Sequence, residues 1–124
     1  MGLFLSNDYE EVMSRLVEGL PRPYGPHVLL KLYTREETTE GGIMLPESVR
    51  EEAVYQGMVG MVLALGPNAY TGEEFKHWQK PCVKDWVLFR PNSGVRFNDQ
   101  NVPLRLVFDD CVLAPVKNPA TITR

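Results

Sequence analysis

Apolar residues recur at helical spacing near the start of the chain and at strand spacing after it. The helical part predicts an amphipathic helix over residues 7–20. Asn7 and Glu10 are placed to form a capping box at its start, and Gly19 and Pro21 to end it. The stripe could dock a partner, but we expect it to pack on the chain's own core. It consists of Val12, Met13, Leu16, Val17 and Leu20.

The rest of the chain reads as β-strands separated by turns. After a stiff linker at 22–26, Leu30 and Leu32 alternate with Lys31 and Tyr33. Glycines at 57 and 60 suggest a bulge or tight bend in a later run. The turn signals between runs favour a small irregular β-barrel over an α/β fold. The predicted strands cover residues 27–33, 54–65, 86–89, 102–108 and 111–116.

The segment 69–81 allows two local structures. Thr71 and Glu74 could cap a short helix, or Thr71-Gly72 could form a hairpin tip. We expect its aromatic residues to bury against the barrel, with binding through exposed aromatics as the alternative. These residues are Tyr70, Phe75 and Trp78.

One apolar triplet stands inside a long polar loop. The flanking residues 34–40 and 47–52 are polar and charged almost throughout. Large apolar side chains displayed on such a tether usually fit a groove on another protein. The glycines give the tether conformational freedom, and the proline prevents a central strand or helix from continuing. The residues concerned are Gly41, Gly42, Ile43, Met44, Leu45 and Pro46.

Composition bounds the class of protein. A chain of 124 residues with 44% apolar residues fits one globular domain with a modest core. The net charge of −3 argues against a nucleic-acid surface. No apolar run has the length of a membrane span, and the N-terminus lacks the pattern of a secretory signal. We therefore expect a cytoplasmic protein whose two cysteines are reduced.

A search for catalytic and metal-binding residues finds no convincing set. His27 opens a predicted strand, and His77 and Cys82 stand apart from Cys111 without a Cys-x-x-Cys pair. No phosphate-binding loop and no local signature of an activated nucleophile occurs. The sequence therefore predicts a binding protein without enzymatic activity, cofactor or metal.

Several segments, in order, resemble the GroES-type co-chaperonin (chaperonin-10) family. The resemblance covers roughly residues 26–116. The glycine pair and apolar triplet at 41–46 are similar to the family's mobile-loop motif. The other matching segments are Gly60–Pro67, Val83–Phe89, Gly94-Val95 and Val112–Val116. Lys84 departs from the pattern, because the family usually has glycine there.

The resemblance implies a division of the chain. Residues 1–25 would form an N-terminal helical extension and linker, and 26–116 a GroES-like barrel. Within the barrel, a mobile loop would span about 34–54 and a roof segment about 67–82. Residues 117–124 would form a flexible tail.

The resemblance also implies a function. The protein would form a homo-heptameric ring that caps a GroEL-type chaperonin and assists ATP-dependent folding of enclosed clients. Ile43, Met44 and Leu45 would bind the chaperonin, with Gly41, Gly42 and Pro46 as the hinge of the loop. ATP would be bound by the partner and not by this chain.

Some details are most like versions carried by bacteriophages and prophages. These are the Asp85-Trp86-Val87 strand, Asp109-Asp110 and the turns at 66–70 and 94–97. A phage protein of this type would be expected to help fold a capsid protein in the host cytoplasm. The alternative is a stand-alone β-barrel interaction or phage structural module that does not bind a chaperonin. A dehydrogenase fragment ranks last, because the glycine-rich nucleotide fingerprint is missing.

Overall fold

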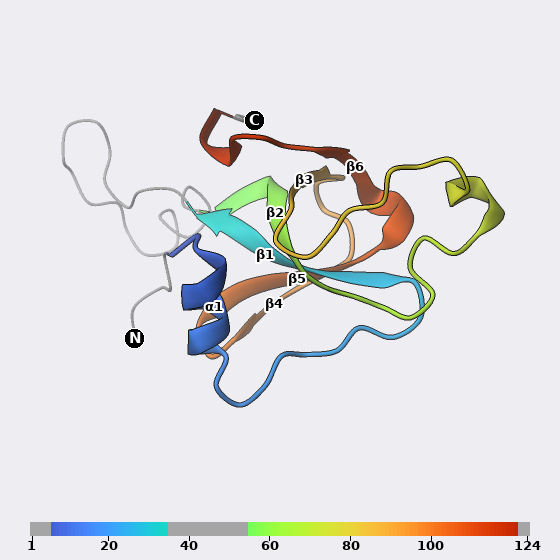
Figure 1. Cartoon of the computed structure of the whole chain (residues 1–124). Helices are drawn as coiled ribbons and strands as arrows, with labels where there is room; N and C mark the ends of the chain where they lie inside the picture. Colours follow the sequence, from blue (N-terminus) through green and yellow to red (C-terminus); the bar gives the residue numbers. More distant parts are fainter. Residues whose placement is uncertain (1–5, 35–54, 122–124) are drawn as a thin grey trace.

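The computed structural model describes residues 6–34 and 55–121, which form one antiparallel sheet and a short helix (Figure 1). The six-stranded sheet has the order β4-β5-β1-β2-β3-β6. This architecture confirms the predicted all-β class. The strands are β1 (His27–Thr34), β2 (Tyr55–Leu65), β3 (Trp86–Phe89), β4 (Val95–Asp99), β5 (Val102–Phe108) and β6 (Val112–Pro115). None of the helices in these ranges is long and apolar enough to cross a membrane.

An inner core lies on one face of the curled sheet. Val107 of β5 and Val112 of β6 belong to it, although these strands stand near opposite ends of the strand order. The sheet must therefore curve to bring its two ends to a common core, as in a small barrel. The inner core consists of Val28, Leu30, Leu32, Val62, Tyr70, Phe75, Val87, Phe89, Val107 and Val112.

An outer core lies between the other face of the sheet and the helix α1 (Tyr9–Arg15). Val12 and Leu16 are 0% and 4% exposed there, so the apolar stripe packs on the chain's own core, as expected. Val17 is 78% exposed and does not belong to the packed face. The buried members of the outer core are Val12, Leu16, Leu29, Met61, Leu63, Val102 and Leu104.

The helix is shorter than the predicted 7–20, and the predicted cap is wrong. Asp8 is the N-cap, and its side chain accepts a hydrogen bond of 3.1 Å from the Glu11 amide. Asn7 lies one residue earlier and binds elsewhere, so no capping box forms with Glu10. The helix ends at Arg15, where Leu16 leaves the helical conformation.

The predicted strands are mostly confirmed, but β4 was not expected. Only Val95 and Phe97 are apolar in this short strand, and three of its five residues are exposed, so the segment gives a weak strand signal. The last strand starts at Val112 because Asp109–Cys111 forms a 3-10 turn. The pairing of β1 with β2 shifts register twice, and a Cβ at Gly60 would stand 3.1 Å from the Leu30 Cβ. The run of β2 that contains Gly57 and Gly60 therefore pairs irregularly with β1, and the two strands approach closely at Gly60.

The segment 67–82 projects from the end of the sheet opposite to Thr34 and holds a 3-10 turn, η1 (Glu73–Phe75) (Figure 1). Tyr70 and Phe75 are buried and pack edge to face at 5.1 Å. The Asp109 carboxylate accepts a hydrogen bond of 3.0 Å from the Tyr70 amide and ties the segment to the barrel. Trp78 is 47% exposed, so the expectation that all three aromatics bury is wrong for it. Thr71 does not cap the turn, because its hydroxyl donates to the Asn68 carbonyl.

Gly94 provides a test of the turn that leads into β4. Its φ is +69°, and a Cβ there would collide with the main-chain carbonyl of Leu106. Gly25 also has a positive φ, +53°, but no atom lies within 4 Å of the position of its Cβ. We expect Gly25→Ala to lower the free energy of unfolding by about 1 kcal/mol, and Gly94→Ala by more than about 3 kcal/mol. Urea unfolding at one protein concentration measures both, and equal losses would contradict this account of the turn.

Candidate functional site

The residues predicted to bind a partner lie outside the described residues. Gly41, Gly42, Ile43, Met44, Leu45 and Pro46 all fall in 35–54. The structure does place the two points where this segment joins the sheet. Thr34, at the end of β1, and Tyr55, at the start of β2, are paired Cα partners. The segment thus leaves and re-enters the barrel through adjacent strand ends.

Thr34 is bound by the side chain of Asn7. The Asn7 amide nitrogen donates to the Thr34 carbonyl at 3.0 Å, and the Thr34 amide donates to the Asn7 Oδ1 at 3.0 Å. The Thr34 hydroxyl donates to the same oxygen at 3.1 Å. Thr34 is only 3% exposed, so these bonds are made in a largely dry environment.

Lys31 reaches the same oxygen from inside the protein. Its ammonium donates to the Asn7 Oδ1 at 2.9 Å, and its side chain is fully buried. Burial away from water lowers the pKa of Lys31 to about 7. A site at the root of the 35–54 segment therefore combines Asn7, Lys31 and Thr34.

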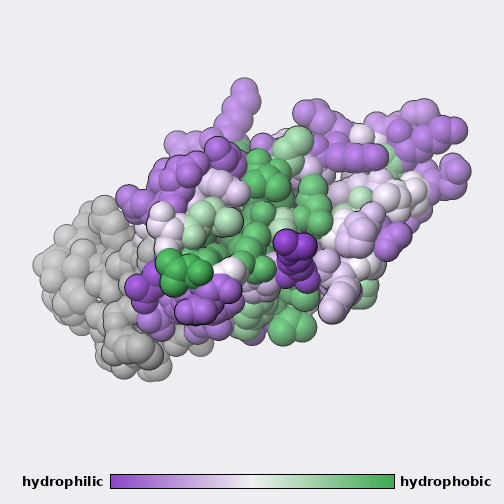
Figure 2. Space-filling model, turned by 60° about the horizontal axis from the view of Figure 1, so that its bottom comes forward, coloured by the Kyte–Doolittle hydropathy of each residue, from purple (hydrophilic) through white to green (hydrophobic). Residues whose placement is uncertain are grey.

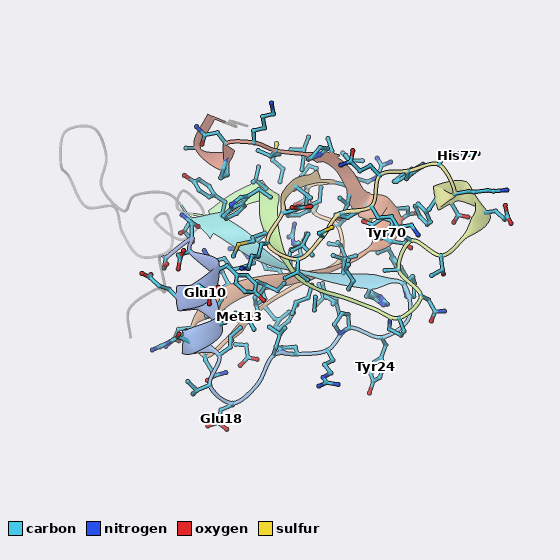
Figure 3. All side chains as sticks on the ribbon, in the orientation of Figure 1. Glu10, Met13, Glu18, Tyr24, Tyr70 and His77 are labelled. Atoms are coloured by element: carbon cyan, nitrogen blue, oxygen red, sulfur yellow. The ribbon has the colours of Figure 1, made fainter. Side chains whose placement is uncertain are left out.

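The histidines and cysteines do not assemble into a second site. The His27 ring stacks on Phe108 at 4.6 Å, and its Nδ1 is 2.9 Å from the Tyr24 carbonyl, which is a structural role. His77 lies at the far end of the projecting segment, and Tyr24 points away from the sheet (Figure 3). Cys82 and Cys111 are both free. Across residues 6–34 and 55–121, no group of three or more His, Cys, Asp or Glu side chains could hold a metal ion.

A small cavity of about 110 Å³ lies between the projecting segment and β6. Tyr70, Trp78 and Pro81 line it from one side, and Val112 and Leu113 from the other. The Tyr70 hydroxyl is buried without a hydrogen-bond partner, and burial together with the nearby charge of Asp109 raises its pKa. This hydroxyl therefore stays neutral, and Tyr70 contributes no charge to the cavity.

The family follows from residues 21–116, which match the model of the chaperonin 10 Kd subunit (Cpn10). The chain belongs to this family. A co-chaperonin GroES of Solidesulfovibrio magneticus is 33% identical over 97 residues, which cover 77% of this chain and 96% of that protein. A co-chaperonin GroES of Clostridium botulinum is 34% identical with the same coverage. The resemblance inferred from the motifs is thereby confirmed, and the class of function is that of a co-chaperonin.

One departure from the family pattern is visible in the fold. Lys84 occupies the usual glycine position with φ +82°, so this turn accepts a side chain in the left-handed region. The Lys84 ammonium lies 4.9 Å from the centre of the Tyr9 ring and 3.5 Å from a Glu10 carboxylate oxygen. The side chain that replaces glycine therefore contacts the helix α1, which precedes the part matched by the family model.

Sequence reasoning missed two residues of this site. The sequence favours Asn7 as a helix cap, although the neighbouring Asp8 is an equally good capping residue. Lys31 was expected to alternate with apolar neighbours, but both faces of β1 are buried. The nearly continuous apolar run around Lys31 was the available signal, because strands buried on both faces lose the alternation.

The burial of Lys31 predicts a pH dependence of stability. Between its folded pKa of about 7 and its ordinary value of 10.5, the unfolded chain binds a proton that the folded chain does not. Stability therefore rises with pH in this window, by up to about 1.4 kcal/mol per pH unit, and Lys31→Met removes this rise. Urea unfolding from pH 7 to 10 measures this effect. The difference in the free energy of unfolding between Lys31→Met and wild type should change with pH.

Lys117→Met is the control for this experiment, because it removes an exposed lysine. Its difference from wild type should stay level over the same range. If the difference in the free energy of unfolding between Lys31→Met and wild type is also independent of pH, the buried position of Lys31 is contradicted.

Proposed function

We propose that this protein forms a ring that caps a GroEL-type chaperonin and assists ATP-dependent folding of enclosed clients. Ile43, Met44 and Leu45 enter apolar grooves of the partner, and Gly41, Gly42 and Pro46 give the loop its hinge. The proposal is supported by the position of this apolar triplet in the sequence, between Thr34 and Tyr55, which are paired in a chain of the chaperonin-10 family. ATP is bound by the chaperonin. The site of action is the cytoplasm, and a phage capsid protein is the client that fits the likeness to phage-carried versions.

The energetics favour binding to the chaperonin through several loops, each of which binds weakly. Burying one large aliphatic side chain contributes about 1.5–3 kcal/mol. Fixing each backbone residue of a loop costs about 1–2 kcal/mol, which cancels much of that gain. One loop therefore binds weakly, and several loops on one ring bind together through their effective concentration.

The described sheet has two open edges that suit assembly into a ring. β4 and β6 each pair with only one neighbour among the described strands. Val95 on β4 is 62% exposed and Leu113 on β6 is 49% exposed. An apolar area also crosses one face of the molecule (Figure 2). Unpaired edges recruit other chains, and joining two different edges head to tail generates a closed ring when the rotation closes.

The apolar triplet provides the direct test of chaperonin binding. Ile43→Asp and Leu45→Asp place a charge where an apolar groove must be filled, and we expect each to abolish nucleotide-dependent co-elution with a GroEL-type ring. Val17→Asp is the matched control, because Val17 is an exposed apolar residue in the N-terminal segment. Wild-type protein that never co-elutes, or Asp variants that still do, would favour a stand-alone module.

The oligomer mass tests the ring. We expect native mass spectrometry to show a heptamer, and Leu113→Lys on the β6 edge to yield smaller species, because an edge lysine opposes strand pairing. Leu65→Lys is the control, since Leu65 is 37% exposed but lies at the end of an internal strand. A wild-type monomer at high concentration would count against the ring.

A further inference from the structure

The N-terminal segment ahead of residue 21 lies outside the part matched by the family model. It is nevertheless the segment that contacts the root of the candidate binding loop. Asn7 is the connecting residue, because its single side chain makes hydrogen bonds in both directions with the main chain of Thr34. A donor and an acceptor offered together are what a neighbouring strand supplies to a strand residue.

Asn7 hydrogen-bonds the end of β1, beyond its pairing with β5. The register of β1 with β5 runs from His27 to Lys31 and ends before Thr34. On the β2 side, Thr34 is the partner of Tyr55 after a shift in register. Thr34 is therefore held between β2 and the amide of Asn7, one residue before the 35–54 segment begins.

Asn7 is itself held in place by the docked helix. Asp8 caps α1, and the Asp8 amide donates to the Ser6 hydroxyl at 3.1 Å. Val12 and Leu16 anchor the helix in the outer core. At its other end, the Arg15 guanidinium donates to the Gln100 carbonyl at 2.8 Å. Figure 3 shows Glu10 and Met13 on the same helix, beside the end of the sheet where β1 stops.

We propose that Asn7 is a positioning residue for chaperonin binding, which fixes the point and direction at which the 35–54 segment leaves the sheet. This inference rests on the proposed function. A fixed exit reduces the number of orientations that must be lost when the triplet enters its groove, and preorganisation of this kind raises affinity. Because every subunit of a ring carries the same contact, a small effect per loop multiplies across the loops that bind together.

The central experiment compares binding of Asn7 variants to a GroEL-type ring in the presence of nucleotide. We expect Asn7→Ala to weaken each loop about threefold and the whole ring by at least about tenfold. Asn7→Asp keeps an acceptor for the Thr34 amide and for Lys31, but it places a second carboxylate oxygen against the Thr34 carbonyl where the donor was. It should therefore recover only part of the affinity. Arg15→Ala is the matched control, since it removes one hydrogen bond from the same segment at the end remote from Thr34.

A second comparison separates positioning from stability. Asn7→Ala deprives the buried Lys31 ammonium of its partner, which could unfold the protein for reasons unrelated to the loop. We therefore also compare Lys31→Met with the double variant Asn7→Ala/Lys31→Met, where no such ammonium exists. The double variant should bind the chaperonin more weakly than Lys31→Met, with the same ring mass, and should exchange its Thr34 amide hydrogen faster.

The outcomes distinguish this inference from the function on which it rests. Wild-type protein that fails to bind any GroEL-type ring with nucleotide refutes the proposed function, and the inference with it. Wild-type binding together with equal affinities for Lys31→Met and its Asn7→Ala double variant refutes the inference alone. Slow, unchanged exchange of the Thr34 amide in the double variant also refutes it.

Discussion

The burial of β1 on both faces is the constraint on which the rest of the structure depends. Its inner face contributes Val28, Leu30 and Leu32 to the inner core, and its outer face contributes Leu29 to the outer core. A six-stranded sheet that curls on itself can cover only the inner face. The outer face is covered because α1 packs across it, and burying large aliphatic residues there stabilises the sheet and the helix together. The helix α1 is for this reason packed as part of the same hydrophobic core as the sheet.

This constraint also explains the polar site at the loop root. A lysine in the middle of a doubly buried strand has no route to water, so its nitrogen must find a partner inside the protein. Asn7 supplies that partner and, with the same side chain, hydrogen-bonds the main chain of Thr34. The position of the helix, the state of the lysine and the end of β1 are consequently set by one small network. Such networks are strong when every member is satisfied and costly when one member is removed.

The sequence predicted the strand-rich class and the positions of five strands to within one residue at each end, because apolar runs such as those in β3 and β5 are bounded by clear turn residues. It failed at β4, where pairing with β5 and not burial makes the strand. It also misplaced the cap of α1, since Asn7 and Asp8 are interchangeable on local grounds and only the distant Thr34 decides between them. The candidate anchors at 43–45 came from sequence pattern alone, whereas the contacts at the loop root depend on residues far apart in the chain and needed the fold.

Lys84 links the turn before β3 to the helix α1. A left-handed lysine costs about 1–2 kcal/mol relative to a relaxed backbone. Its contacts to the Tyr9 ring and to Glu10, both largely at the surface, return about that much or somewhat less. The left-handed turn at Lys84 and the helix α1 are therefore coupled through the Lys84 side chain. A barrel deprived of residues before 21 would keep the left-handed lysine and lose both of the contacts that offset its cost.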